Sequence, residues 1–270
     1  MSGTSLLPWR RPHLNVIVLH GTIAARAGML NADSVRPLIA KGFASTGRRP
    51  VILDIESPGG SPVQSDLIAS MIRDHADKAG VRVHAVIREV GASGGYWIAC
   101  AADEIHANPM SIVGSIGVVG GGFGFPDLLG RLGIERRIYT AGTNKARLDP
   151  FSPEKPEDVA FAKELMDKLH ARFKAWVRTR RGQRLKVPDD GVPDDGVFDG
   201  GYMLGEQALA IGLIDGLSTV DELVRQLGGD RARPRRIAPK RPRLSLRLPR
   251  LALEALLDVL EERAGRINLR

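Results

Sequence analysis

Short runs of β-branched and other apolar residues alternate with amphipathic stretches along the first third of the chain. The runs at 14–19, 50–55 and 81–87 are typical of buried strands. Apolar residues at helical spacing in 32–41 and 62–77 predict a helix after each of the first two strands. This alternation predicts an α/β fold whose sheet is largely parallel.

The pattern changes in the second half, where helices dominate. Residues 135–141, "ERRIYTA", predict a further strand, and an apolar stripe predicts a packing helix over 156–181. The turn-rich segment 189–201 is acidic but lacks the ligand spacing of a calcium loop, which favours a solvated loop. Residues 203–217 read as a short helix, a glycine stop and a strand, and 219–229 as a helix with a glycine C-cap.

The charge of the chain is concentrated in one segment. The net charge is +8, yet residues 231–250 hold nine Lys or Arg and no acidic residue, so the other 250 residues sum to −1. The body is therefore nearly neutral, which argues against a nucleic-acid-binding surface. No aromatic residue occurs from 231 to 270 to stack on bases, so nucleic acid is not an expected partner of the tail either.

These patterns predict four parts. Residues 1–13 form an N-terminal extension, 14–229 a globular body, 230–249 a basic linker rich in Pro and Arg, and 250–270 an amphipathic helix. The basic linker and apolar helix together suit an anionic membrane surface or a partner groove. A disordered tail, or a helix docked on its own oligomer, remains an alternative.

The sequence shows neither a signal peptide nor a run of roughly 18 apolar residues, so we expect a cytoplasmic protein with at most peripheral contact with the inner membrane. Cys100 is the single cysteine, which excludes an internal disulfide and offers no metal-ligand spacing. The sequence predicts no metal site and no cofactor, and Cys100 is expected to pack in the core.

Ser93 is the first candidate for chemistry. The segment "GASGG", 91–95, fits the G-x-S-x-G pattern of a nucleophile at a strand-to-helix turn. A hydrolase of that type needs a histidine further along, and only His106 and His170 follow. His106 lies in an expected short buried strand and His170 on the outer edge of the long helix, so neither makes a convincing general base.

A second glycine-rich loop, "SPGG" at 57–60, also follows a predicted strand. The carboxyl ends of parallel strands meet at one edge of a sheet, so this loop and Ser93 are expected to lie together. Backbone N–H groups there could stabilise an oxyanion, one from Gly94 and one from Gly59 or Gly60. A tight turn that binds nothing is the alternative.

Without a histidine, the base could be a lysine held neutral by burial. Lys145 lies in a glycine-containing loop after the predicted strand 135–141, and a semi-buried setting is expected there. Lys163, Lys168 and Lys174 lie on the long amphipathic helix, where solvent would keep them charged. The residues alone thus rank Lys145 first among the lysines.

An ordered set of motifs over residues 14–228 resembles the S49 peptidases, the family of signal peptide peptidase A and SohB. The motifs are "SPGG", "ASGGYWIACAAD", "SIVGSIGVV", "NKARLDPFSP" and "GEQALAIGLID", in that order. The resemblance implies a fold similar to ClpP and crotonase, with repeated ββα units and a parallel sheet. It also implies a serine endopeptidase that uses a Ser-Lys dyad.

The same resemblance assigns roles by motif. Ser93 would be the nucleophile and Lys145 the general base, 52 positions later. Ser115 would orient the lysine amine, and Gly94 with Gly59 or Gly60 would form the oxyanion hole. It further implies peptide substrates, such as remnant signal peptides, and a ring-like homo-oligomer that shields the sites.

Two positions depart from the family pattern, and two other functions stay open. Glu56 stands where the family commonly has Asn, and Trp97 where it has Tyr. A ClpP-like triad would place a histidine near position 118, which is Val118. A crotonase-type acyl-CoA enzyme, or a non-catalytic scaffold that binds peptides or membranes, remains an alternative on the same fold.

Overall fold

The computed structural model describes residues 12–44, 46–186 and 196–239. The chain divides into two units, Met1–Pro239 and Lys240–Arg270. The second unit, and with it the predicted amphipathic helix 250–270, lies outside the described residues, as does most of the N-terminal extension. Among the described helices, none is long and apolar enough to cross a membrane.

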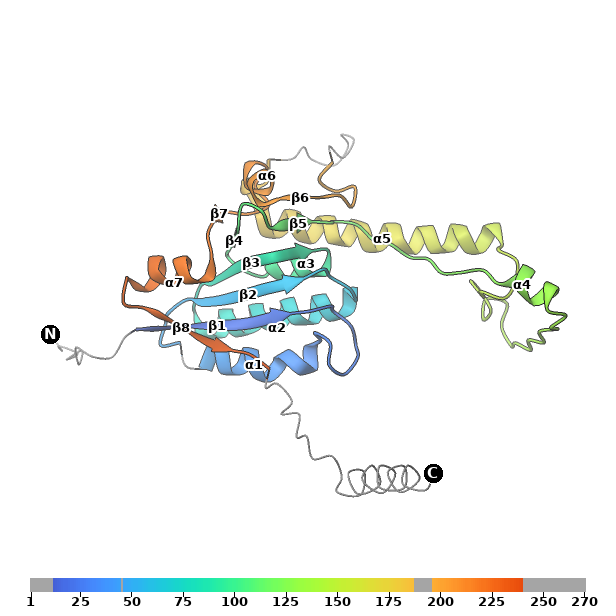
Figure 1. Cartoon of the computed structure of the whole chain (residues 1–270), viewed down its shortest axis with the longest axis horizontal. Helices are drawn as coiled ribbons and strands as arrows, with labels where there is room; N and C mark the ends of the chain where they lie inside the picture. Colours follow the sequence, from blue (N-terminus) through green and yellow to red (C-terminus); the bar gives the residue numbers. More distant parts are fainter. Residues whose placement is uncertain (1–11, 45, 187–195, 240–270) are drawn as a thin grey trace, which may run out of the picture. The chain divides into compact units, whose positions relative to one another are not determined.

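The centre of the described unit is one eight-stranded sheet (Figure 1). Its strands are β1 (His13–His20), β2 (Val51–Ser57), β3 (Val83–Ala92), β4 (Glu104–Ala107), β5 (Ile112–Gly114), β6 (Tyr202–Leu204), β7 (Gly216–Leu217) and β8 (Arg233–Ile237). The order is β6-β5-β3-β2-β1-β8, while β4 pairs with both β3 and β7. Every pair is parallel except β5 with β6, which confirms the predicted α/β fold with a largely parallel sheet.

A helix is present in each described range where the sequence predicts one, whereas the helix Pro126–Arg131 and a short 3₁₀ turn were not predicted. They are α1 (Ala32–Ala44), α2 (Pro62–Ala79), α3 (Gly94–Ala99), α4 (Pro126–Arg131), α5 (Pro156–Arg181), α6 (Gly205–Ala210) and α7 (Val220–Gly228), with a 3₁₀ turn at Gly182–Arg184. The ends of α2 are set locally: the Ser61 hydroxyl accepts from the Gln64 N–H, and Gly80 closes the helix at φ 61°. The predicted range, 62–77, stops two residues before the helix ends.

Alternate strand residues enter two separate cores. Ile17 and Leu19 of β1 belong to the larger core, which α1, α2 and α3 cover, whereas Leu14 and Val16 join the smaller one with α7. This alternation is the two-residue period of a strand. It fixes the register of the sheet, because a slip by one residue would exchange the two faces.

The predicted boundary of the globular body at 229 is wrong. Residues 233–237, predicted as the start of a linker, form β8 and pair with β1 in parallel at the edge of the sheet. Pro234 is compatible with an edge strand, because its missing N–H can face away from the neighbouring strand. Arg236 also pairs with the buried Asp54 at 2.8 Å, so part of the basic segment belongs to the body.

The predicted strand at 135–141 is also wrong. These residues form no strand and are all exposed. They belong to a segment that we call the arm, residues 119–155, in which no residue is buried and α4 is the only regular element. Strands need neighbouring strands for their hydrogen bonds, and the arm offers none.

Helix α5 joins the arm to the body. Its carboxyl-terminal half packs through Phe173 and Val177, which lie in the larger core. Its amino-terminal half extends away from the sheet, and Figure 1 shows α4 beyond the sheet at the far end of α5. Pro156 lies 17 residues before Phe173, which is about 25 Å along a helix. The carboxyl-terminal end of the arm, at residue 155, therefore lies well away from the core.

Candidate active site

Ser93 lies at the junction of β3 and α3, in a strained conformation. Its φ is 50° and its ψ −121°, a region that residues with a side chain rarely occupy. The turn is held on both sides, because the Ser93 N–H donates to the Gly114 carbonyl at 2.8 Å and the Ser93 carbonyl accepts from the Trp97 N–H at 2.9 Å. Strain that the surroundings maintain in this way is characteristic of functional residues.

The "SPGG" loop packs directly against this turn. A Cβ placed on Gly59 would lie 2.7 Å from the Ser93 Cβ and 2.8 Å from the Gly94 nitrogen, and Gly59 has a φ of 98°. A Cβ on Gly60 would lie 2.0 Å from the Ile23 carbonyl oxygen. Both positions therefore require glycine. The predicted meeting of the two loops is present in the structure.

The backbone donors near Ser93 differ in their partners. The Gly59 N–H donates to the Ser57 hydroxyl oxygen at 3.2 Å. Among the hydrogen bonds between described residues, none is donated by the N–H of Gly60 or of Gly94. A Cβ built on Gly94 would lie 3.4 Å from the Gly60 nitrogen, so Gly60 and Gly94 are close neighbours.

Ser115 directly follows Gly114, the residue whose carbonyl binds the Ser93 N–H. Gly114 accepts the Ser93 N–H, and the Ser115 N–H donates to the Gly201 carbonyl at 2.6 Å. Ser115 has a φ of 53°, so it shares with Ser93 an unusual positive φ. The structure thus places Ser93, Ser115, Gly94 and the glycine pair in one region at the carboxyl ends of the strands.

Lys145 is not part of this region. It lies on the arm and is exposed, so the semi-buried loop expected for it is absent. Its own N–H donates to the Gly142 carbonyl at 3.3 Å, and no hydrogen bond between described residues joins it to Ser93 or Ser115. The fold of one chain assembles the candidate nucleophile and oxyanion donors without the candidate base.

The sequence from α2 to the last strand is similar to a known peptidase family. The model of "Peptidase family S49" matches residues 75–232, more than half of the chain and the span from α2 to the start of the last strand. The chain belongs to peptidase family S49. In this S49 member the matched span contains Ser93, Ser115 and Lys145, while the "SPGG" loop precedes it.

Individual relatives of this S49 member fall into two groups. A protein named "Probable protease SohB" from Haemophilus influenzae is 30% identical over 64% of this chain and 47% of its own length. A protein named "Na(+)/H(+) antiporter NhaA" from Brucella abortus is 43% identical over 89% of this chain, which is 32% of the antiporter. The chain thus spans about a third of the antiporter and about half of the SohB protein.

Of the two histidines that follow Ser93 in this S49 member, one lies far from Ser93 and the other contacts a backbone carbonyl. His106 lies on β4, as expected, at the opposite end of the sheet from Ser93. The His170 Nε2 lies 3.0 Å from the Ile116 carbonyl oxygen, to which it can only donate. The expectation that neither histidine serves Ser93 agrees with these contacts.

Two further residues beside the turn, Trp97 and Cys100, are buried. Trp97 stacks on Trp176 and packs against Phe173, so its departure from the family pattern is accommodated in the core beneath α3. Cys100 is buried, and burial raises the pKa of its thiol to about 12. Such a thiol is not ionised near neutral pH, which agrees with the packing role predicted for it.

Two contacts at the site were missed from the sequence. Ser57 occupies the N–H of Gly59, and Ile23 fits against Gly60 from a loop more than 30 residues earlier. The Ser57 contact is local, and the serine two residues before the glycine was its available signal. The Ile23 contact had no signal, because it depends on the path of the loop after β1.

Proposed function

We propose that this chain is a serine endopeptidase in which Ser93 is the nucleophile. The observation that carries the proposal is the strained turn of Ser93, held by Gly114 and packed against Gly59, in a chain of peptidase family S49. A strained strand-to-helix turn presents a serine hydroxyl at the start of a helix, where the helix dipole favours developing negative charge.

The oxyanion donors in this proposal are the N–H groups of Gly94 and Gly60. Both lack a partner among the described residues, whereas the Gly59 N–H is held by Ser57. Gly59 then serves as a spacer whose missing side chain allows the two loops to touch. Two preorganised donors of this kind typically accelerate acyl transfer strongly, with roughly 100- to 1000-fold lost when one is removed.

Lys145 of a second copy of this chain would supply the base. Lys145 is exposed on the arm, and the arm exposes large apolar side chains that a monomer would rarely leave in water. These are Val119, Phe123, Leu128, Leu132, Ile134, Ile138, Tyr139, Leu148 and Phe151. Packing this surface onto a neighbouring body would bury the apolar residues and bring Lys145 toward a Ser93 that lacks a base.

The chemistry follows from that arrangement. Burial against the neighbour would favour the neutral amine of Lys145, because desolvation disfavours the ammonium form, and the Ser115 hydroxyl would orient the amine. The neutral amine takes the Ser93 proton as Oγ attacks the peptide carbonyl, and the resulting lysine ammonium protonates the leaving amine. Water then hydrolyses the acyl-enzyme, again with Lys145 as base.

The proposed substrates are extended peptides with apolar or small side chains, such as remnant signal peptides, cleaved inside a ring-like oligomer. The protease name of the SohB relative supports peptide hydrolysis in general and specifies no substrate. The antiporter name describes a protein about three times as long as the matched region, so we propose no transport activity for this chain. Contact of the tail, residues 231–270, with an anionic membrane stays a proposal.

A complementation experiment tests the shared site. Ser93→Ala and Lys145→Ala should each reduce hydrolysis of a fluorogenic peptide by at least about 1000-fold, because each removes one half of the dyad. Mixing the two inactive variants and allowing subunits to exchange should restore activity, since some pairs then combine an intact Ser93 with an intact Lys145. Lys155→Ala is the matched control, because Lys155 is an exposed lysine of the same arm.

The outcomes separate the alternatives. Full activity in either single variant contradicts the dyad. Inactive variants that fail to complement after verified exchange contradict the shared site and leave a dyad within one chain. A wild-type chain that neither hydrolyses peptides nor reacts at Ser93 with a fluorophosphonate probe supports the scaffold alternative, and saturable acyl-CoA binding supports the crotonase-type one.

A further inference from the structure

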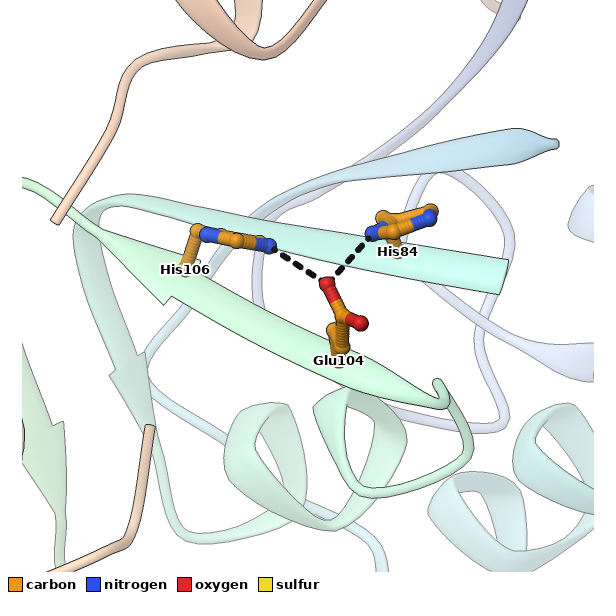
Figure 2. Close-up of side chains that lie close together, drawn as sticks. All are labelled: His84, Glu104 and His106. Atoms are coloured by element: carbon orange, nitrogen blue, oxygen red, sulfur yellow. Dashed lines mark ion pairs between the residues drawn. The ribbon is translucent and has the colours of Figure 1, made fainter. Parts of the chain in front are cut away.

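A second group of reactive side chains lies at the opposite end of the sheet from Ser93. His84 is the second residue of β3, and Glu104 and His106 lie on the neighbouring parallel strand β4, where Glu104 pairs with His84 in the register. Residues two apart on a strand point to the same face, so Glu104 and His106 emerge together. Figure 2 shows the three side chains converging, with Glu104 between the two imidazole rings.

The distances are close to those of a metal site. One oxygen of Glu104, Oε2, lies 3.3 Å from His84 Nδ1 and 3.5 Å from His106 Nε2. All three ligand atoms lie within 4.8 Å of one another. A tetrahedral zinc ion with bonds of about 2.0–2.1 Å needs its ligand atoms about 3.4 Å apart. Two of the three separations already meet this requirement, and the third, between the two ring nitrogens, is at most 4.8 Å.

The ring nitrogens at the centre of the cluster face the Glu104 carboxylate. His84 Nδ1 and His106 Nε2 are buried, and neither meets Glu104 Oε2 in the geometry of a hydrogen bond. Leaving buried polar atoms unsatisfied is costly, and each such case calls for an explanation.

Neighbouring residues position Glu104 and leave space for the His106 ring. Arg82 donates to the other carboxylate oxygen of Glu104, Oε1, at 2.8 Å, which fixes the carboxylate and leaves Oε2 for a ligand role. A Cβ on Gly216 would lie 3.0 Å from His106 Nδ1, so glycine at this position leaves room for the ring. The Glu104 side chain is 32% exposed, which provides a route for an ion to enter.

We propose that His84, Glu104 and His106 bind a divalent transition-metal ion of the zinc type, which ties β3 to β4. Two imidazoles and one carboxylate are a typical ligand set for zinc, with a water molecule as the fourth ligand. His84 precedes Ser93 by nine residues on an extended strand, about 30 Å. The ion would therefore stabilise the sheet and take no part in reactions at Ser93, and the proposal is independent of the proposed function.

No sequence pattern indicated this cluster. The absence of cysteine pairs led to the prediction of no metal site, and a Glu-x-His pair 20 residues after a lone histidine matches no familiar metal motif. The cluster arises only because β4 lies beside β3 in this particular register. Within the described part of the chain it is the one group of three such ligands.

The test measures metal binding by the full chain, purified without a histidine tag and treated with a chelator. Titration with Zn²⁺ against a chromophoric chelator should show one bound equivalent, and Co²⁺ should give the intense visible bands of a tetrahedral site. Excess Zn²⁺ should raise Tm by at least about 5 °C at 100 times the Kd, whereas Mg²⁺ should not. His106→Gln and His84→Asn should each weaken Zn²⁺ binding at least about 100-fold.

His75→Gln is the matched control, because His75 lies on α2 with its Nδ1 bonded to the Met71 carbonyl. This variant should bind Zn²⁺ like the wild type. If the buried His84→Asn variant fails to fold, Glu104→Gln tests the site in its place. The amide oxygen of Gln can still accept the hydrogen bond from Arg82 but binds a metal ion poorly. A wild type that binds no Zn²⁺, or variants at Glu104 and His106 that bind it undiminished, would overturn the proposal.

Discussion

The turn that carries Ser93 and the arm that carries Lys145 are built in opposite ways. Every residue of α3, directly after Ser93, is buried, and Gly59 fits against the turn so closely that no side chain could replace its hydrogen. In the arm, residues 119–155, no residue is buried at all. The fold of one chain fixes the Ser93 turn, whereas the arm leaves Lys145 exposed.

This difference shows which half of the proposed dyad the fold completes. A nucleophile needs a fixed orientation, and the packing around Ser93 provides it. A lysine base needs desolvation, which an exposed arm can obtain only from something that covers it.

Trp97→Ala should destabilise the chain most, because Trp97 is 9% exposed and packs on Phe173 and Trp176 beneath the Ser93 turn. Removing a buried indole of this kind costs about 3–5 kcal/mol. Urea unfolding followed by circular dichroism measures the change. A loss below about 1 kcal/mol would show that the turn does not depend on this stack.

Gly59→Ala should lower kcat/KM by about 100-fold, because its Cβ would displace Ser93 and the Gly94 N–H from their positions. Gly21→Ala is the matched control: Gly21 also has a positive φ, of 112°, but its Cβ would meet nothing within 4 Å. Peptide hydrolysis and the rate of probe labelling at Ser93 report the effect. Equal losses of kcat/KM in Gly59→Ala and Gly21→Ala would show that backbone strain alone causes the effect.

Asp215→Asn should weaken the attachment of α5 to the body by about 2 kcal/mol, because Arg181 donates two hydrogen bonds of 2.8 Å to this carboxylate. Burial raises the pKa of Asp215, but the bonds from Arg181 and Ile105 outweigh it, and the pKa is lowered. A carboxyl with a lowered native pKa stabilises the fold above its unfolded pKa, about 4, and this stability is lost as the pH falls through the native value.

Urea unfolding between pH 3 and pH 7 checks this pH dependence. The wild type should lose stability below about pH 4, and the Asp215→Asn chain should show a smaller loss over the same range. Identical pH profiles for the two chains would show that Asp215 does not contribute through its charge.

Tyr139→Ala should have the smallest effect on the stability of one chain, within about 0.5 kcal/mol, because Tyr139 is 90% exposed on the arm. Its proposed partner is another copy, so light scattering should show weaker association and activity should fall on dilution. Unchanged association in this variant and in Phe123→Ala would argue against the arm as an interface.

Many of the helices and turns of this protein can be predicted from its sequence alone. The helix at 156–181 has the predicted bounds, because its apolar stripe, its first-turn Pro156 and its closing Gly182 are all local signals. The strand before Ser93 and the glycines around it are likewise local signals, and both loops were expected at one edge of the sheet because each follows a parallel strand.

Tertiary structure decided the rest. Residues 233–237 became a strand because β1 offered a free edge, and 135–141 did not because no strand lies beside them. His84 meets Glu104 and His106 only through the register of β3 and β4. Local patterns specify which element forms, since they depend on neighbours in the chain. Pairing between strands and burial of an arm depend on surfaces far away in the sequence, or on another copy, and no local pattern records them.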